Sequence, residues 1–309
     1  MDRFHLMSVF VAVAEEQSFA AAARRLQMSP PAVTRAILAL ETRLGVKLLN
    51  RTTRYVRSTD AGLRYLEDAR RIMTEADEAD EAAAGVNAEP RGQLTVTAPV
   101  LFGRMFVMPG MVDYLQRFPA MAISALFVDR VVNFLEEGID VGIRIGELAD
   151  SSMKAIQVGQ VSRVVCAAPA YLAAHGVPAT PEQLARHTVI ASSAVASDSE
   201  WRFIGGNKPG SIKPSDKQVS SAKIRPRLTV SSNDAAIEAA LRGFGVTRLL
   251  SYQIAPYLAS GQLQIVLAGY QPASVPIHVL HREGRPASAK VRGFVDLLVD
   301  SLRGNQALR

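Results

Sequence analysis

The sequence predicts an α+β and α/β protein with three consecutive parts: a small N-terminal α+β domain, a long helix and a C-terminal α/β domain of two lobes. Three patterns predict this order. Apolar residues recur at helical spacing in the first part, a proline-free helical stretch follows, and strand and helix patterns alternate in the remainder. At roughly 100–200 residues per domain, the 309 residues fit two or three domains. We place the parts at residues 1–59, 60–89 and 90–309.

The composition excludes disordered and membrane-spanning classes of protein. Apolar residues make up 48% of the chain and charged residues 21%, which is typical of folded globular proteins. No apolar run approaches the roughly 18 residues that span a bilayer, and the N-terminus lacks the basic and apolar sections of a secretory signal. We therefore expect a cytoplasmic protein without a membrane partner. Its single cysteine, Cys166, cannot form an internal disulfide or a site of several thiolates.

Two helices are predicted at the N-terminus. The first ends near residue 17, and its apolar face is formed by residues at helical spacing. This face consists of Phe4, Met7, Val9, Phe10 and Val13. Ser18 is a good N-cap for a second, alanine-rich helix that continues to about Leu26. The helical pattern then breaks at residues 27–28.

A third helix is predicted to begin after Ser29, which suits the N-cap position. It places Pro30 and Pro31 in the first turn, where a missing N–H costs little, and Gly45 supplies the C-terminal stop. The stripe expected to be buried consists of Val33, Ile37, Leu40 and Leu44. Two helices joined by so short a turn form a helix-turn-helix, and the alternative is an ordinary helical hairpin.

The segment after the third helix favours the helix-turn-helix. Residues 46–49 and 55–57 are predicted to pair as short strands around a basic turn at residues 50–54, which makes a wing. Residues 24–57 contain eight basic residues and one acidic residue, a net charge of +7. Residues 72–89, by contrast, contain six acidic residues and no basic one. Only the first cluster is dense enough to suit a polyanion such as DNA.

The motif SFAAAARRLQMSPPAVTRAILALETRLGVKLLNRTTRYVRSTDAG resembles the DNA-binding segment of the LysR-type transcriptional regulators. The length and order of the chain match this family throughout. The resemblance implies a winged helix-turn-helix, a long linker helix and a two-lobed, periplasmic-binding-protein-like effector domain. It therefore implies a sequence-specific DNA-binding regulator that a small-molecule effector controls, and no enzyme. Ala20 and Pro31 depart from the pattern, since many members carry Thr and Ser there, and base preference could differ.

The resemblance assigns DNA contacts to the third helix and the wing. Those expected to face the major groove are Ser29, Pro30, Pro31, Thr34 and Arg35. Those expected at the minor groove or backbone are Arg51 and Arg54, with Ser18, Thr52 and Thr59 on phosphates. Arg35 is the leading base reader, because a guanidinium can contact guanine in a bidentate manner that discriminates by roughly 1–3 kcal/mol. Double-stranded DNA with a partly symmetric operator is the expected partner.

A long helix is predicted from residue 62 to about residue 85, with an approximate heptad seam that Asp80 breaks. The seam consists of Leu66, Ala69, Met73, Ala76 and Ala83. This stripe is too narrow to be buried within one chain, so we expect a homodimer through the linker helix. The resemblance further implies a dimer of dimers.

The C-terminal part alternates predicted strands and helices in two sets. In the first set, strands are expected at residues 94–97, 123–128 and 141–145, with helices at 102–118 and 131–137. In the second set, strands are expected at residues 164–167, 189–190, 246–249, 263–267 and 277–280. Helices of this set are expected near Tyr171 and at residues 181–187, 234–242 and 290–302. The last helix is expected to pack on the first half. Lobe I then spans about residues 90–162 and 268–309, lobe II about 163–267, and residues 205–223 form an exposed loop.

An effector is expected between the lobes, because ligands of open α/β sheets bind beyond the carboxyl ends of strands. The strand-to-helix turn of lobe I supplies Thr97, Pro99, Val100, Leu101 and Phe102. The other candidates are Arg144, Gly146, Ser193, Trp201, Phe203 and Asn233. Trp201 and Phe203 are expected either to stack on the ligand or to belong to the core. The net charge of +7 beyond residue 89, although scattered, suggests an anionic effector.

Catalytic motifs are weak in this sequence, so no cofactor or metal is expected. His278 and His281 form His-x-x-His without accompanying carboxylates or cysteines, and His5, His175 and His187 are isolated in the sequence. Nucleophile-elbow, phosphate-loop and dinucleotide-binding signatures are missing. Two alternatives to a regulator stay open at this point. They are a two-lobed solute-binding receptor and an α/β enzyme, each with an N-terminal assembly segment.

Overall fold

The computed structural model describes residues 2–51, 56–84, 89–148, 153–192, 200–207, 217–270, 274–282 and 288–308. It divides into two compact units, one chiefly of residues 1–88 and one chiefly of residues 89–309. Each unit is described by itself below. Within the described residues, no helix combines the length and the apolar character that crossing a bilayer requires.

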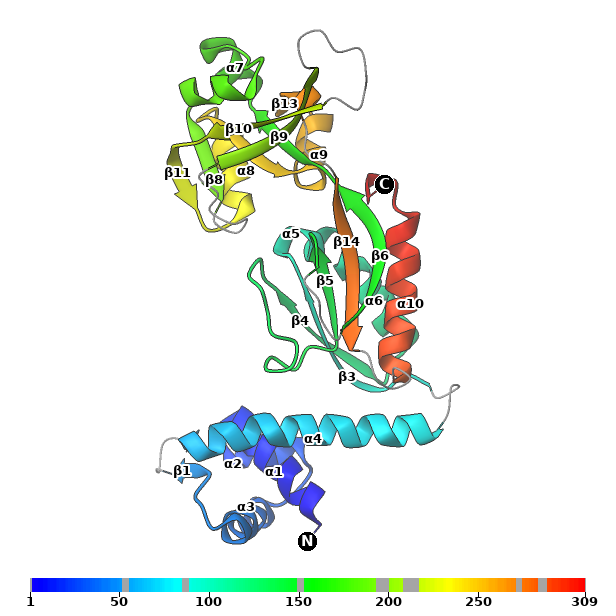
Figure 1. The fold of residues 1–309 in the computed structure, drawn as a ribbon. Coiled ribbons are helices and arrows are strands. Elements are labelled where there is room, and N and C mark those ends of the chain that lie inside the picture. The colour runs from blue at the N-terminus through cyan, green and yellow to red at the C-terminus, as the bar shows by residue number, and fades with distance from the viewer. Residues whose placement is uncertain are drawn as a thin grey trace. The chain divides into compact units, whose positions relative to one another are not determined.

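The N-terminal unit contains the predicted helices α1 (Arg3–Glu16), α2 (Phe19–Arg25) and α3 (Pro30–Leu44). A hairpin of β1 (Leu49–Arg51) and β2 (Val56–Ser58) follows, and then the long helix α4 (Asp60–Ala84) (Figure 1). The strands pair antiparallel with Leu49 opposite Ser58. The first strand therefore starts three residues later than the sequence predicted. The tip of the hairpin lies outside the described residues.

Helix α1 is more deeply buried than its apolar face predicted. Val9, Phe10 and Val13 pack against α2 and α3, whereas Met7 and Val11 lie in a second cluster with α4. Since α1 contacts helices on two sides, most of its circumference is covered. Phe4, which was assigned to the buried face, is 48% exposed near the start of the helix.

The structure corrects one predicted helix face and shows part of another covered within the chain. Leu44 is 37% exposed, because α3 ends there at Gly45 with φ +69°, and Glu41 occupies the buried face instead. The seam of α4 was expected to need a second chain. Its residue Ala69 is fully buried against Met7 and Val11 of α1 in the same chain, with Leu66 and Met73 beside it.

Lobe I is a five-stranded mixed sheet in the order β4-β3-β5-β14-β6. Its strands are β3 (Gly92–Ala98), β4 (Met121–Phe127), β5 (Val141–Ile145), β6 (Met153–Val161) and β14 (Val275–Arg282). The helices are α5 (Val100–Phe102), the π-helical turn η1 (Gly103–Val107), α6 (Met108–Arg117) and α10 (Ala289–Gly304). Helix α10 runs along β6 and β14 (Figure 1) and contacts α6, which confirms that the last helix returns to the first half.

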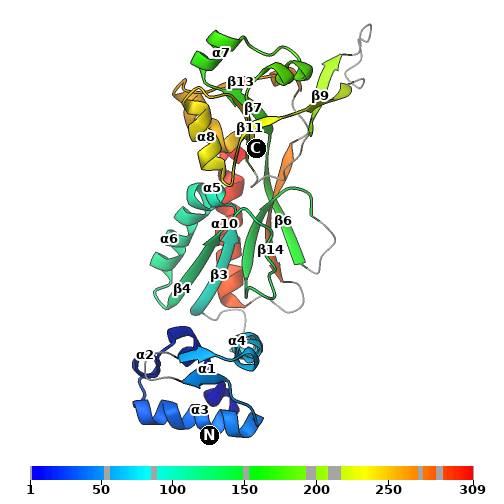
Figure 2. The same cartoon turned by 90° about the vertical axis from the view of Figure 1, so that its left-hand side faces the viewer.

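Lobe II is a second five-stranded sheet, in the order β11-β8-β12-β7-β13. Its strands are β7 (Arg163–Ala167), β8 (Val189–Ser192), β11 (Pro226–Val230), β12 (Val246–Leu250) and β13 (Gln264–Val266). The helices are α7 (Pro169–His175), η2 (Pro181–Arg186), α8 (Asn233–Leu241) and α9 (Ser251–Ala259). The chain enters the lobe between β6 and β7 and returns to lobe I at β14, as predicted (Figure 2).

The structure corrects the element list of the C-terminal part in five places. Residues 131–137 form turns rather than a helix, because the Asn133 side chain accepts from the backbone N–H groups of Leu135 and Glu136. The strands β6 and β11 and the helix α9 were not predicted. The expected loop at residues 205–223 contains the end of β9 (Glu200–Asn207) and all of β10 (Lys217–Lys223), which pair antiparallel.

Candidate nucleic-acid interface and effector site

The exposed face of α3 carries the residues expected to read DNA. Pro31, Arg35 and Leu38 are exposed at intervals of four and three residues, so they share one helix face. Thr34 is half-buried, and its hydroxyl donates to the Pro30 carbonyl oxygen at 3.1 Å. Ser29 holds the N-cap position without a side-chain hydrogen bond, which leaves its hydroxyl available. The opposite face buries Val33, Ala36, Ile37 and Leu40.

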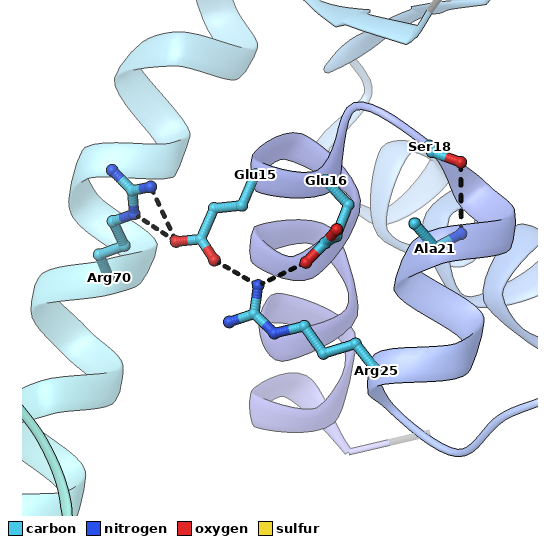
Figure 3. A network of polar contacts seen from close by, with 6 residues as sticks. All are labelled: Glu15, Glu16, Ser18, Ala21, Arg25 and Arg70. Carbon is cyan, nitrogen blue, oxygen red and sulfur yellow. Dashed lines mark hydrogen bonds and ion pairs between the residues drawn. The ribbon is translucent and has the colours of Figure 1, made fainter. Parts of the chain in front are cut away.

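The turn between α2 and α3 is set by local hydrogen bonds. Gln27 adopts a left-handed conformation with φ +52°, and the Met28 N–H donates to the Ala23 carbonyl oxygen at 2.9 Å. At the other end of α2, the Ser18 hydroxyl oxygen accepts from the Ala21 N–H at 3.2 Å (Figure 3). The predicted N-cap is therefore confirmed, and its hydroxyl proton can still bond a phosphate.

Glu41 attaches the hairpin to the recognition helix α3. Its Oε1 accepts from the backbone N–H groups of Leu48 and Leu49 at 2.9 and 3.1 Å, and the residue is only 7% exposed. This carboxylate is the single acidic residue of the basic stretch at residues 24–57. The sequence analysis counted it as a charge and missed its structural role.

Thr59 is also engaged within the protein. Its hydroxyl donates to the Lys47 carbonyl oxygen at 2.8 Å and accepts from the Gly62 N–H at 2.9 Å. It therefore caps the start of α4 and ties it to the hairpin, which favours this role over a phosphate contact. Of the other wing candidates, Thr52 and Arg54 lie outside the described residues, and for Arg51 only the backbone is described.

Arg25 belongs to the basic cluster of the sequence but faces acidic residues of its own chain. Its Nη1 donates to Glu15 Oε2 at 2.7 Å and to Glu16 Oε1 at 3.4 Å. Burial alone raises the pKa of the Glu15 carboxyl, but hydrogen bonds from Arg25 and Arg70 outweigh burial and lower it. The positive charge of Arg25 is thus partly neutralised before any DNA approaches.

In lobe I, the turn after β3 is only partly accessible. Thr97 is fully buried, and its hydroxyl donates to the Leu126 carbonyl oxygen at 2.8 Å. Leu101 and Phe102 are also in the core. Pro99 is half-buried and Val100 is 36% exposed, so they are the accessible members of the predicted turn.

The N-terminus of α5 already holds a carboxylate of the protein. The Val100 N–H donates to Asp129 Oδ1 at 3.1 Å. Half-burial raises the pKa of Asp129, the Val100 hydrogen bond opposes this, and the negative charge of Asp234 raises it further. Because Asp129 follows β4 and Asp234 lies in α8, negative charges from both lobes act on one another.

Aromatic rings join the two lobes beside these carboxylates. The Phe102 ring of lobe I packs edge-on against the Tyr252 ring of lobe II, with centroids 5.4 Å apart. Phe106 contacts the same tyrosine at 5.7 Å. Burial raises the pKa of the Tyr252 hydroxyl, so this side chain is a neutral part of the contact.

Five side-chain polar atoms of lobe II are buried without a hydrogen-bond partner among the described residues, and two of them, Asn233 Oδ1 and Ser192 Oγ, lie where the parallel strands β11 and β8 end. Asn233 is 4% exposed and heads the buried face of α8, while Ser192 ends β8. Buried polar atoms are usually satisfied, so such atoms at the carboxyl end of a sheet indicate a ligand or water position. Ser193 lies outside the described residues.

The remaining effector candidates fall in different places. Arg144 is half-buried on β5, opposite His278 of β14, and Gly146 follows β5 with φ +138°. Trp201 and Phe203, 5% and 2% exposed, are packed in the lobe II core. The Arg248 guanidinium lies 4.9 Å from the Trp201 ring centroid. Of the two alternatives predicted for these aromatics, their packing favours the role in the core.

Other reactive groups of the C-terminal unit are embedded in its structure. His175 and His187 are not isolated, because both contact Tyr171: the His175 ring stacks on its ring at 4.3 Å, and His187 Nδ1 lies 3.3 Å from its hydroxyl. Burial raises the pKa of the Cys166 thiol to about 12. Among the residues that the structure describes, no group of three or more His, Cys, Asp or Glu side chains is arranged to hold a metal ion.

Comparisons with known proteins agree with this architecture. Residues 4–63 match the family described as bacterial regulatory helix-turn-helix protein, lysR family, and residues 87–303 match the LysR substrate binding domain. The HTH-type transcriptional regulator CrgA of Neisseria meningitidis serogroup B is 31% identical over 97% of each chain. The HTH-type transcriptional activator AaeR of Escherichia coli K12 is 30% identical over 97% of this chain and 94% of that protein.

Solved structures show the same fold. CrgA from Neisseria meningitidis superposes with a TM-score of 0.60 at 30% identity, covering 97% of this chain and 99% of that one. Full-length AphB, the virulence activator of Vibrio cholerae, has a TM-score of 0.62 at 23% identity over 97% and 99% of the chains. The fold is therefore an N-terminal helix-turn-helix domain followed by a two-lobed regulatory domain.

The protein belongs to the LysR family of transcriptional regulators. It combines the family's DNA-binding domain with its effector-binding domain, and the resemblance found in the sequence is confirmed. Members of this family regulate transcription and are not enzymes. The solute-receptor and enzyme alternatives have no support among these relatives.

Proposed function

We propose that this regulator reads a partly symmetric operator in the cytoplasm through the exposed face of α3, with Arg35 as the principal base reader. The observation that carries the proposal is the division of α3: Val33, Ile37 and Leu40 are buried, whereas Pro31 and Arg35 are exposed on the opposite face. An exposed helix face with an arginine in its first two turns suits the major groove. Ser18, Ser29 and Pro30 would contact or position the flanking backbone, and Arg51, Thr52 and Arg54 would do so from the wing.

The test is a fluorescence anisotropy titration of the full chain against DNA from upstream of its own gene and against a scrambled duplex. Arg35→Ala should lower the preference for the cognate duplex, while Arg51→Ala should weaken both duplexes evenly. Arg242→Ala removes an exposed charge from lobe II and serves as the matched control. If Arg35→Ala and Arg242→Ala bind both duplexes alike, the assignment of α3 as the reader is wrong.

We infer that a small-molecule effector binds between the lobes, near Pro99 and Val100 of lobe I and Ser192 and Asn233 of lobe II. The unpartnered Asn233 Oδ1 supports this position, and Arg144, Gly146 and the undescribed Ser193 remain candidates at its border. A screen by thermal shift should find a ligand whose stabilisation is lost in Asn233→Ala and kept in Ser260→Ala, an exposed lobe II control. A ligand that stabilises both variants equally would place the site elsewhere.

The charge at this position argues against the anionic effector that the overall composition suggested. Asp129 occupies the N-terminus of α5, where an anion would otherwise bind, and Asp234 adds a second negative charge nearby. A ligand with hydrogen-bond donors, such as an amine or a hydroxyl compound, suits these acceptors better. The screen should therefore contain amines and carboxylates of matched size, and a preference for carboxylates would contradict the inference.

We further propose a homodimer through α4, and a dimer of dimers as its larger assembly. The full-length structures of relatives such as CrgA support an oligomer. Because Ala69 is covered by α1, the pairing surface differs from the predicted seam, and Leu63, which is 52% exposed, is available to it. Light scattering at several concentrations tests the assembly, and a monomer at all of them would refute it.

A further inference from the structure

Three helices of the N-terminal unit meet at one carboxylate. Glu15 at the end of α1 binds Arg25 of α2 through Oε2 at 2.7 Å. Its other oxygen, Oε1, accepts from Nε and Nη2 of Arg70 on α4 at 3.0 and 2.7 Å. Figure 3 shows the two arginines on opposite sides of Glu15, each directed at its own oxygen. We call this three-residue contact the Glu15 clamp.

The clamp adds charged, directional hydrogen bonds to the apolar contact between α1 and α4. That contact includes Met7 and Val11 of α1 against Ala69 of α4, with Leu66 and Met73 beside them. The Phe10 ring of α1 also packs edge-on against the Tyr65 ring of α4, with centroids 5.4 Å apart. Apolar burial is largely non-directional, whereas aromatic pairs prefer an edge-on or offset geometry. Arg70 directly follows Ala69 in α4, and its guanidinium donates two N–H groups to Glu15. These hydrogen bonds fix both the position and the angle of α4 relative to α1.

The clamp is a network of hydrogen-bonded ion pairs rather than a single surface pair. Isolated exposed pairs contribute little to stability, but networks with bidentate geometry are the exception. The Glu15 side chain is 27% exposed, and both of its oxygens are bonded to arginines. The hydrogen bonds from these arginines also hold the pKa of Glu15 below its ordinary value, so the clamp stays charged at neutral pH.

We infer that Arg70 is a positioning residue: through Glu15 it fixes the angle between α4 and the helix-turn-helix, and this angle determines the half-site spacing that a dimer accepts. The inference rests on the proposed pairing through α4 and the proposed reading by α3. In a dimer joined by α4, any rotation of α4 on α1 moves the two copies of α3 relative to each other. Half-sites must fit this separation, which is set by the helical turn of DNA.

The first test measures the clamp without DNA. Spin labels are placed on the full chain at Ala39→Cys of α3 and Glu67→Cys of α4, both exposed positions, while the buried Cys166 stays unlabelled. The clamp variant is Arg70→Gln. The matched control is Arg71→Gln, which removes the neighbouring charge, whose ion pair with Asp68 lies within α4. We expect a broader distance distribution within one chain for Arg70→Gln and an unchanged one for Arg71→Gln. Equal distributions would overturn the inference.

The second test measures spacing selectivity with duplexes selected by the wild-type protein from a random pool. The selected site is compared with variants that gain or lose one or two base pairs between half-sites, and with a single half-site. Wild type and Arg71→Gln should lose about tenfold or more in affinity on a spacing change, and Arg70→Gln about threefold or less. All three should bind the single half-site alike. If Arg70→Gln weakens every duplex by one factor, its role is structural only and the inference fails.

The two tests separate this inference from the proposed function. If the wild-type chain selects no sequence, reading by α3 is refuted, and the spin-label distances still decide whether Arg70 fixes the helix angle. If wild type selects a site and Arg70→Gln keeps its full spacing selectivity, the proposed function stands and the inference is overturned. Glu15→Gln provides a second variant that keeps the size of the side chain, and it should behave as Arg70→Gln does.

Discussion

Replacing Glu41 by alanine should detach the wing from α3 at a measurable cost. The lost carboxylate oxygen accepts from Leu48 N–H at 2.9 Å and from Leu49 N–H at 3.1 Å. A hydrogen bond to a charged group contributes roughly 1.5–3 kcal/mol. Because both N–H groups share one oxygen, and because water reaches them once the side chain is gone, we expect a local loss of about 2–4 kcal/mol.

Hydrogen exchange is the suitable assay, because a chain of two units does not unfold in one step and its single Trp201 reports only on lobe II. The amides of Leu48 and Leu49 should exchange faster in Glu41→Ala by about thirtyfold or more, which corresponds to the lower end of that loss. Glu41→Gln retains an acceptor and should show a smaller change. Glu67→Ala, an exposed position on α4, is the control.

The same variant should bind DNA more weakly, since the wing strand is no longer held beside α3. The affinity loss should affect cognate and scrambled duplexes alike, because wing contacts mainly fix position. Unchanged protection of the Leu48 and Leu49 amides in Glu41→Ala would refute the reasoning. Faster exchange with intact DNA binding would show that the wing is dispensable.

Three further predictions follow from buried groups. The Cys166 thiol, whose pKa burial raises to about 12, should react with a disulfide reagent at pH 8 only after denaturation, and rapid native labelling would contradict its burial. Burial and the nearby His175 lower the pKa of His187 from 6.5, so the unfolded state binds the proton more readily than the folded state. The stability of the protein should therefore fall as the pH drops below about 6.5. In thermal melts, His187→Gln should make this pH dependence less steep. Gly62→Ala should destabilise the start of α4 by about 2 kcal/mol or more, because the added Cβ would lie 2.0 Å from the Leu48 carbonyl oxygen. Thermal melts of the full chain measure this loss, and a melting temperature equal to that of wild type would refute the prediction.

The spacing of apolar residues predicted best those elements in which buried and exposed positions differ most in polarity. The strand β5 was predicted with its observed bounds, since its apolar run is buried, whereas β6 was missed. This edge strand pairs only with β14 and buries just Val158 and Val161, so its sequence shows little alternation. A strand that lies at the border of a sheet leaves a weak sequence signal because few of its side chains need to be apolar.

The site was less predictable than the fold because side-chain partners come from distant segments. The sequence could not tell whether Trp201 and Phe203 face a ligand or the core, since both alternatives require the same apolar residues. His175 and His187 are separated in sequence, and only the fold of α7 and η2 brings both to Tyr171. A signal existed for Glu41, since a lone acidic residue in a strongly basic stretch indicates a specific structural partner.

The density of basic residues overstates the charge that the N-terminal unit presents to DNA. Arg25 is bound by Glu15 and Glu16, so a member of the sequence cluster stabilises helix packing instead. The Glu41 carboxylate accepts from backbone N–H groups of the hairpin and so holds the wing beside α3. The acidic residues of this unit therefore divide between two tasks, orienting α4 and holding the wing. Arg35 on the open face of α3 is left exposed, so its charge, unlike that of Arg25, is available to DNA.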